Sequence, residues 1–298
     1  MRTMIGRIAA AAVLSFAAAS FAVPQVQAAE EEGGTVHYPL RQPRQMNWTF
    51  DGPFGAFDPA QLQRGFQVYR EVCAACHSME FVAFRTLGSS KGPHFSEEAV
   101  RALAAEYEIT DGPDENGDMF ERPGTPADRI PPPYPNEQAA RAANGGAYPP
   151  DLSLIAKART VERGFPAFVF DAFTQYQEAG PNYLYSLLTG YVDPPEGVEV
   201  RDGLYYNPYF VAGDQLAMPP PLSDGQITYA QNEDDNPAND VPETVDQYSR
   251  DVTAFMVWAA EPHMVERKSM GFTVMIFLII FAGLVYYTKR KVWEAVEH

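Results

Sequence analysis

The sequence predicts a mainly helical protein, in which one loop-rich domain precedes a single C-terminal transmembrane helix. Three observations lead to this fold class. Amphipathic helical patterns open and close the central region, strand patterns are weak throughout, and residues 270–287 contain no charged side chain.

The N-terminal residues 1–28 are typical of an export signal. Arg2 and Arg7 give a positive start, residues 8–21 are apolar and rich in alanine, and residues 26–28 offer a cleavage site. An N-terminal membrane helix is the alternative, but the apolar stretch is short and ends before Pro24. We therefore expect removal of this segment and a body, residues 29–267, that lies outside the cytoplasm.

The C-terminal apolar segment has the length of a membrane span. Residues 270–287 would extend roughly 27 Å as a helix, at about 1.5 Å per residue. Arg267 and Lys268 precede this stretch, and three basic residues follow it at 289–291. We expect an anchor over 268–288 and a cytoplasmic tail over 289–298, because basic residues favour the cytoplasmic side.

Two longer helices are predicted at the ends of the body. Asp58 and the following proline predict a helix start, and apolar residues share one face of that helix to about Cys73. Thr244 resembles the first residue of a capping box for a helix that ends near Pro262. Gly65 would let another helix cross closely, so we expect the two helices to cross; two unrelated amphipathic helices are the alternative.

The region between them is predicted to hold short helices at 96–107, 136–144, 152–158 and 183–189. Loops rich in proline, glycine and aspartate separate these helices, notably 111–135 and 193–208.

Cys73, Cys76 and His77 form the Cys-x-x-Cys-His pattern of covalent haem attachment. We expect thioether bonds from both cysteines and an axial iron bond from His77. A zinc site would need four ligands, and the chain has no second cysteine pair. A thioredoxin-like redox pair would lie in a βαβ pattern and would not need His77.

Met218 is the candidate for the second axial ligand. It ends an irregular stretch and precedes three prolines, which can stiffen a loop that holds a thioether against iron. His94 is the main histidine rival. Met/His ligation closes both axial positions and favours electron transfer. Three other methionines are less suitable, being too near His77, in an acidic loop or within a helix: Met79, Met119 and Met256.

Residues 29–267 hold 37 acidic and only 16 basic side chains. This charge excludes nucleic acid as a partner, because phosphates would be repelled. It would attract a basic partner, although simple solubility is the alternative explanation.

The chain resembles the cytochrome c1 family of quinol–cytochrome c reductase (bc1) complexes, through strings that extend over most of the mature chain in the family's order. The resemblance implies a class I cytochrome c-like haem domain with long loop insertions and one C-terminal membrane helix. The strings are RGFQVY (64–69), DGP (111–113), MF (119–120), ARAAN (140–144), PPDLS (149–153), SLLTGY (186–191), YNPYF (206–210), MPP (218–220) and WAAEP (258–262).

The resemblance also implies roles for single residues. Met218 matches the axial methionine, and Arg159 matches an arginine that contacts a haem propionate. Tyr183 and Asn144 match residues of the haem pocket, and Pro149 matches a proline that lines it. A solvated cation is the alternative for Arg159, and a helix C-terminus is the alternative for Asn144.

One segment departs from the family pattern. Between Arg159 and Tyr183, within 160–181, lie four phenylalanines that we expect to be buried against the body or a neighbouring subunit: Phe165, Phe168, Phe170 and Phe173. No disulfide can brace this region if both cysteines hold haem.

The implied function is one-electron transfer through a covalent haem c, from a Rieske iron–sulfur protein to a soluble basic cytochrome c. Cytochrome b and membrane lipid are the other implied partners. The chain would lie in a bacterial inner membrane with its haem domain in the periplasm, as an electron carrier within a proton-translocating oxidoreductase. Acidic residues at 233–235 and at 111, 114, 115 and 118 are candidates for a docking field. The rival functions are a cytochrome serving a terminal oxidase, a haem peroxidase and a structural assembly subunit.

Overall fold

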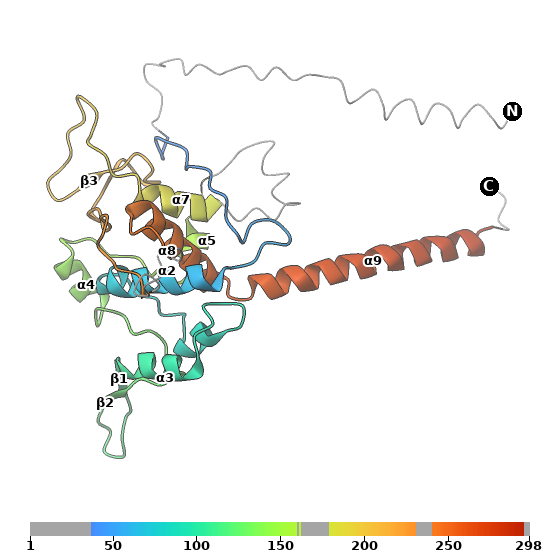
Figure 1. The fold of residues 1–298 in the computed structure, drawn as a ribbon, viewed down its shortest axis with the longest axis horizontal. Helices are drawn as coiled ribbons and strands as arrows, with labels where there is room; N and C mark the ends of the chain where they lie inside the picture. The colour runs from blue at the N-terminus through green and yellow to red at the C-terminus, as the bar shows by residue number, and fades with distance from the viewer. Residues whose placement is uncertain (1–36, 160, 162–178, 231–239, 295–298) are drawn as a thin grey trace. The chain divides into compact units, whose positions relative to one another are not determined.

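The computed structural model describes residues 37–159, 161, 179–230 and 240–294, and helices dominate these residues (Figure 1). The expected export signal at 1–28, the four phenylalanines of 165–173 and the acidic residues 233–235 lie outside the described residues.

The two longer helices of the body form as the sequence predicts. Helix α2 spans Pro59–Glu71, and the Asp58 side chain accepts a hydrogen bond from the Ala60 amide at its N-terminus. Helix α8 spans Val245–Ala260, and Thr244 accepts from the Gln247 amide. The Gln247 side chain donates to Asp251. The cap at Thr244 therefore works through the threonine hydroxyl.

Helices α2 and α8 cross at Gly65, which confirms the expected crossing (Figure 1). A Cβ atom at Gly65 would lie only 2.1 Å from the Asp251 carbonyl oxygen. The Phe255 ring lies 5.5 Å from the Phe66 ring and 6.0 Å from the Tyr69 ring. This crossing is the centre of the aromatic core that supports the start of the haem motif.

Shorter elements complete the body. Helix α7 (Ala179–Leu188) begins four residues before its predicted start at Tyr183, and α5 (Ile155–Ala158) packs against both α7 and α8. The remaining helices are the 3₁₀ turns η2 (Cys73–Ala75) and η3 (Phe84–Gly88), and the α-helices α3 (Glu97–Ala105) and α4 (Glu137–Ala143).

Two small antiparallel hairpins lie in segments that were expected to be loops. Strand β1 (Glu108–Asp111) pairs with β2 (Phe120–Pro123), and β3 (Tyr205–Tyr206) pairs with β4 (Gln215–Leu216). The first hairpin has no buried face, so its sequence lacks the apolar alternation that marks most strands. The Arg122 side chain stabilises it instead, through ion pairs with Asp111 and Asp128.

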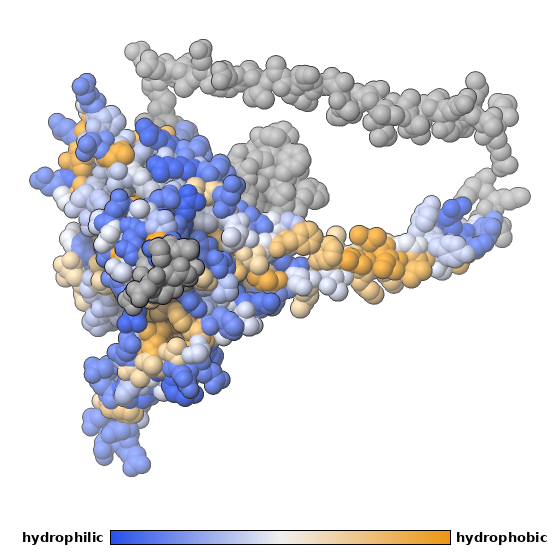
Figure 2. Space-filling model, viewed as in Figure 1, coloured by the Kyte–Doolittle hydropathy of each residue, from blue (hydrophilic) through white to orange (hydrophobic). Residues whose placement is uncertain are grey.

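Helix α9 (Met264–Val292) is the one helix, among the described residues, that is long and apolar enough to cross a membrane. Its most apolar window has a mean hydropathy of 2.2. Figure 2 shows the hydrophobic surface of α9 and the hydrophilic surface toward its C-terminal end. Its first turns belong to the body, because Met264 and Lys268 are buried there.

Candidate haem-binding site

The end of α2 brings the haem-motif residues into one turn. After Glu71 the chain tightens into η2, where the amides of Cys76 and His77 both donate to the Cys73 carbonyl, at 3.1 and 2.9 Å. The buried Tyr69 hydroxyl donates to the His77 carbonyl at 3.3 Å. This compact turn presents both thiols and the imidazole from adjacent positions.

The His77 ring is oriented by one hydrogen bond. Its Nδ1 atom lies 2.8 Å from the carbonyl oxygen of Pro150, which can only accept a hydrogen bond. Nδ1 must therefore carry the hydrogen, and Nε2 keeps its lone pair. Burial also lowers the pKa of His77 below its ordinary value. A neutral imidazole with a fixed tautomer is the form that binds a metal.

Asp151 ties the His77 segment to the Pro150 segment. Its Oδ2 atom accepts from the Ser78 hydroxyl at 2.8 Å and from the Glu80 amide at 2.9 Å, while Oδ1 accepts from the Ser153 amide at 2.8 Å. Sequence reasoning assigned no role to Asp151. The Asp-x-Ser spacing indicates a local turn, but nothing in the sequence indicates the bonds to Ser78 and Glu80.

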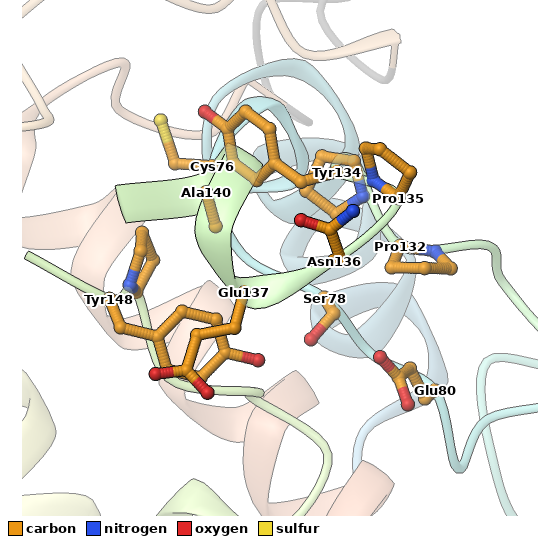
Figure 3. A pocket seen from close by; sticks show the side chains of 12 residues that line it. Cys76, Ser78, Glu80, Pro132, Tyr134, Pro135, Asn136, Glu137, Ala140 and Tyr148 are labelled. Carbon is orange, nitrogen blue, oxygen red and sulfur yellow. The ribbon is translucent and has the colours of Figure 1, made fainter. Parts of the chain in front are cut away.

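A pocket opens beside the haem motif, and Figure 3 shows the side chains that line it. Pro149 and Cys76 both line this pocket. Asn144 forms the C-cap of α4, and its side chain donates to the Tyr134 hydroxyl at 3.2 Å. Asn144 therefore ends helix α4, as the helix C-terminus alternative predicts. Its hydrogen bond to Tyr134 also connects its side chain to the pocket lining. The lining includes Cys76, Ser78, Tyr134, Asn136, Tyr148 and Pro149.

A second group of predicted residues gathers around α7. Arg159 lies close enough to interact electrostatically with the phenol of Tyr183. Tyr183 is buried, and burial raises its pKa above the ordinary value. Burial also raises the pKa of the neighbouring Tyr191 phenol, and an electrostatic interaction with Tyr183 raises it further. The Tyr191 hydroxyl donates to the Met218 carbonyl at 3.1 Å. Tyr191 therefore holds the methionine loop, a role that sequence reasoning missed.

The two groups are joined by a short piece of chain. Pro150, which orients His77, and Arg159, which lies near Tyr183, are only nine residues apart, with α5 between them. Gly180 makes this junction close, because a Cβ atom there would lie 1.7 Å from the Ala156 carbonyl oxygen. Helix α5, which follows the Pro150 segment, is thus packed directly against α7.

The donor set fits a covalently attached haem. Both cysteines are free thiols, and burial raises the pKa of Cys73 to about 12. A redox-active dithiol needs a lowered pKa, so this environment argues against the thioredoxin-like alternative. Two unpaired thiols beside a neutral imidazole suit thioether attachment and axial ligation.

His94, the rival axial ligand, lies on a different loop. It is exposed and has a φ of 58°. The preceding residue, Pro93, accepts a hydrogen bond from Gln63 at 2.7 Å, and Gly92 contacts the indole of Trp258. These contacts place the His94 loop against the middle of α2 and the end of α8.

A helical body with this haem motif, followed by a membrane-spanning helix, defines a membrane-anchored c-type cytochrome. A sequence profile of the cytochrome C1 family matches residues 48–296. The chain belongs to the cytochrome c1 family and carries one covalently bound haem c. Members of this family are the haem subunit of the bc1 complex.

Curated relatives agree with this assignment. The chain is 54% identical over 287 residues to the cytochrome b/c1 of Bradyrhizobium diazoefficiens, covering 96% of this chain but only 40% of that protein. It is 46% identical to the cytochrome c1 of Blastochloris viridis, covering 98% of this chain and 97% of that protein. For the cytochrome c1 of Rhodospirillum rubrum the identity is 45%, with coverage of 91% and 92%.

These findings confirm the predicted fold class, family and cofactor. The roles of the individual haem contacts and the domain boundaries stay predictions.

Proposed function

We propose that this chain takes single electrons from a Rieske iron–sulfur protein and passes them to a soluble basic c-type cytochrome. The observation that carries the proposal is the hydrogen bond from His77 Nδ1 to Pro150, which fixes the ring with Nε2 available for iron. When bound, haem supplies a one-electron iron couple. The protein supplies the attachment, the axial donors and the polarity around them.

Each residue of the site has a part in this function. Cys73 and Cys76 would tether the porphyrin, and His77 and Met218 would be the two iron ligands. The Tyr191 hydrogen bond holds the Met218 backbone. With both ligands supplied by the protein, iron would have no open site for oxygen or peroxide, which separates this function from that of a haem peroxidase.

Arg159, Tyr183, Asn144 and Pro149 complete the proposed haem pocket. Arg159 is exposed at the C-terminus of α5, where its guanidinium can pair with a propionate. The position of Arg159 beside the buried Tyr183 phenol supports this role.

The proposed setting is a bacterial inner membrane, crossed once by α9. The basic residues at 289–291 follow the apolar stretch and favour a cytoplasmic C-terminus, which leaves the haem domain in the periplasm. Cytochrome b, the Rieske protein and membrane lipid are the partners there. Quinol–cytochrome c oxidoreduction coupled to proton translocation belongs to the assembled complex.

Acidic residues on the β1–β2 hairpin are part of the proposed docking field for the basic cytochrome. Asp111 pairs with Arg122, and the Asp114 carboxylate accepts hydrogen bonds from the Asn116 and Asp118 amides. These hydrogen bonds lower the pKa of Asp114, so it stays ionised at neutral pH. Electron transfer to the basic cytochrome should therefore slow as ionic strength rises. If the rate of electron transfer does not change with salt concentration, these acidic residues serve only to keep the surface solvated.

The axial assignment is tested by redox titration of Met218→Leu. We expect a much lower midpoint potential and loss of electron transfer, while the chain still inserts and keeps its haem. Met119→Leu is the matched control, because Met119 is 60% exposed on the hairpin. An unchanged potential in Met218→Leu would refute the assignment, and His94→Ala would then be the next variant to titrate.

The complex is tested by purification of the native assembly from membranes. Cytochrome b and the Rieske protein should copurify with this chain, and the preparation should reduce a basic cytochrome c with quinol as donor. Copurification with a terminal oxidase in place of cytochrome b would favour the rival function.

A further inference from the structure

The loop over residues 51–56 carries an exposed aromatic side chain. Phe54 is 74% exposed, the highest fraction among the large hydrophobic side chains that the structure describes. Its neighbours Pro53 and Ala56 are also exposed, and residues 52–57 contain no charge.

The loop is held rigidly by its ends. Phe50 and Phe57 are buried, and their rings lie 5.4 Å apart. The Ala56 amide donates to the Thr49 carbonyl at 3.0 Å. Gly55 allows the tight turn, since a Cβ atom there would lie 2.1 Å from the Asp51 carbonyl oxygen. The fold therefore holds Phe54 in its exposed position.

The loop and Phe50, the residue that precedes it, contact the start of α9 at two points. The buried Lys268 ammonium donates to the Phe50 carbonyl. One turn further along α9, the Phe272 ring lies 5.4 Å from the Phe54 ring in an edge-to-face contact. Four residues of helix correspond to roughly 6 Å of rise, so Phe54 lies beside the first uncharged turn of the spanning helix.

We propose that the loop over residues 51–56 is a second membrane contact, with Phe54 inserted among lipid acyl chains beside Phe272. Continuity with the apolar surface of α9 carries this inference, because lipid that surrounds Phe272 also meets the ring in contact with it. Phenylalanine is among the residues that enter the boundary between headgroups and acyl chains. The loop has no basic residue to bind a phosphate headgroup, so the apolar part of the lipid is its partner.

The contact restricts the anchored domain. A single helix leaves a domain free to tilt, whereas a second contact on a rigid loop limits the tilt about α9. Asp51 and Asp58, at the two ends of the loop, limit how deeply it can enter. This inference does not depend on the electron-transfer role.

Photo-crosslinking tests the contact on the full-length haem protein in phosphatidylcholine vesicles. Phe54→p-benzoylphenylalanine should give a lipid adduct, detected by mass spectrometry of the peptide that contains it. The same substitution at Phe277, within α9, is the positive control. Phe81, 60% exposed on the body, is the matched control and should give no lipid adduct.

Three results would overturn the proposal. These are no lipid adduct at position 54 when position 277 gives one, an equal yield at positions 54 and 81, and crosslinks from position 54 to a second polypeptide chain in place of lipid. The last result would mean that protein covers the loop. The haem absorbance of each variant verifies folding, and Pro53 provides a second probe position at the same tip.

Discussion

Gly65→Ala should destabilise the body by separating its two longer helices. In an exposed helix the same substitution stabilises by about 0.5–1 kcal/mol, because alanine loses less backbone entropy than glycine. At the crossing, the new Cβ atom would lie 2.1 Å from the Asp251 carbonyl oxygen and 2.7 Å from the Phe255 Cβ atom. The predicted sign is therefore the opposite of the usual one.

The magnitude follows from the distance that the helices must move. Ordinary contact begins near 3.4 Å, so the two backbones must separate by about 1.3 Å. Overpacking of this kind costs about 3 kcal/mol at the upper end of its usual range. After the propensity gain we expect a net loss of about 2 kcal/mol, or about 4–8 °C in Tm for a domain of this size.

Thermal unfolding of the detergent-solubilised haem protein, followed by circular dichroism, measures this loss. Gly213→Ala is the matched control, because a Cβ atom there meets its nearest neighbour at 3.9 Å and should leave Tm nearly unchanged. An equal or higher Tm for Gly65→Ala would refute the close crossing of α2 and α8.

Three further predictions concern buried or bridging carboxylates. Asp251→Asn should cost about 3–5 kcal/mol in denaturant unfolding, because it removes the buried carboxylate charge that pairs with the largely buried Arg64. A cost below about 1 kcal/mol would contradict the argument. Asp151→Ala should raise the midpoint potential while haem stays attached, because it removes a negative charge beside His77 and loosens the Pro150 carbonyl whose hydrogen bond makes the imidazole a more basic ligand. An unchanged potential with an unchanged haem spectrum would contradict this positioning role of Asp151. The pKa of Asp128 is held far below its ordinary value, chiefly by hydrogen bonds from Arg122. The contribution of Asp128 to the hairpin is therefore complete above about pH 4 and is lost as pH falls further. Hydrogen exchange of β1 and β2 should stay constant from pH 7 to about 4 after correction for intrinsic rates, and a loss of protection near pH 6 would contradict it.

Features that depend on neighbouring residues were predictable from the sequence. The caps at Asp58 and Thr244, the haem motif and the apolar span are each defined within a few residues or by a continuous run. Gly65 was also recognised as a point of close approach, because only a missing side chain permits it.

The partners of these residues were decided by tertiary structure. His77 and Pro150 are 73 residues apart, and no local pattern indicates that this carbonyl orients the ring. The same is true of the Tyr191 hydrogen bond to Met218 and of the Asp151 bonds. The β1–β2 hairpin was missed because an Arg122 ion-pair network, rather than a buried face, stabilises it.

The sequence by itself thus determined which cofactor the chain binds and that it is anchored, because covalent attachment and membrane insertion depend on short contiguous segments. Only the tertiary structure decided how the imidazole is oriented, what holds the methionine loop and how the start of α9 joins the body. Those features arise from single hydrogen bonds and ring contacts between distant segments, and hydrophobic pattern along the chain does not encode their pairing.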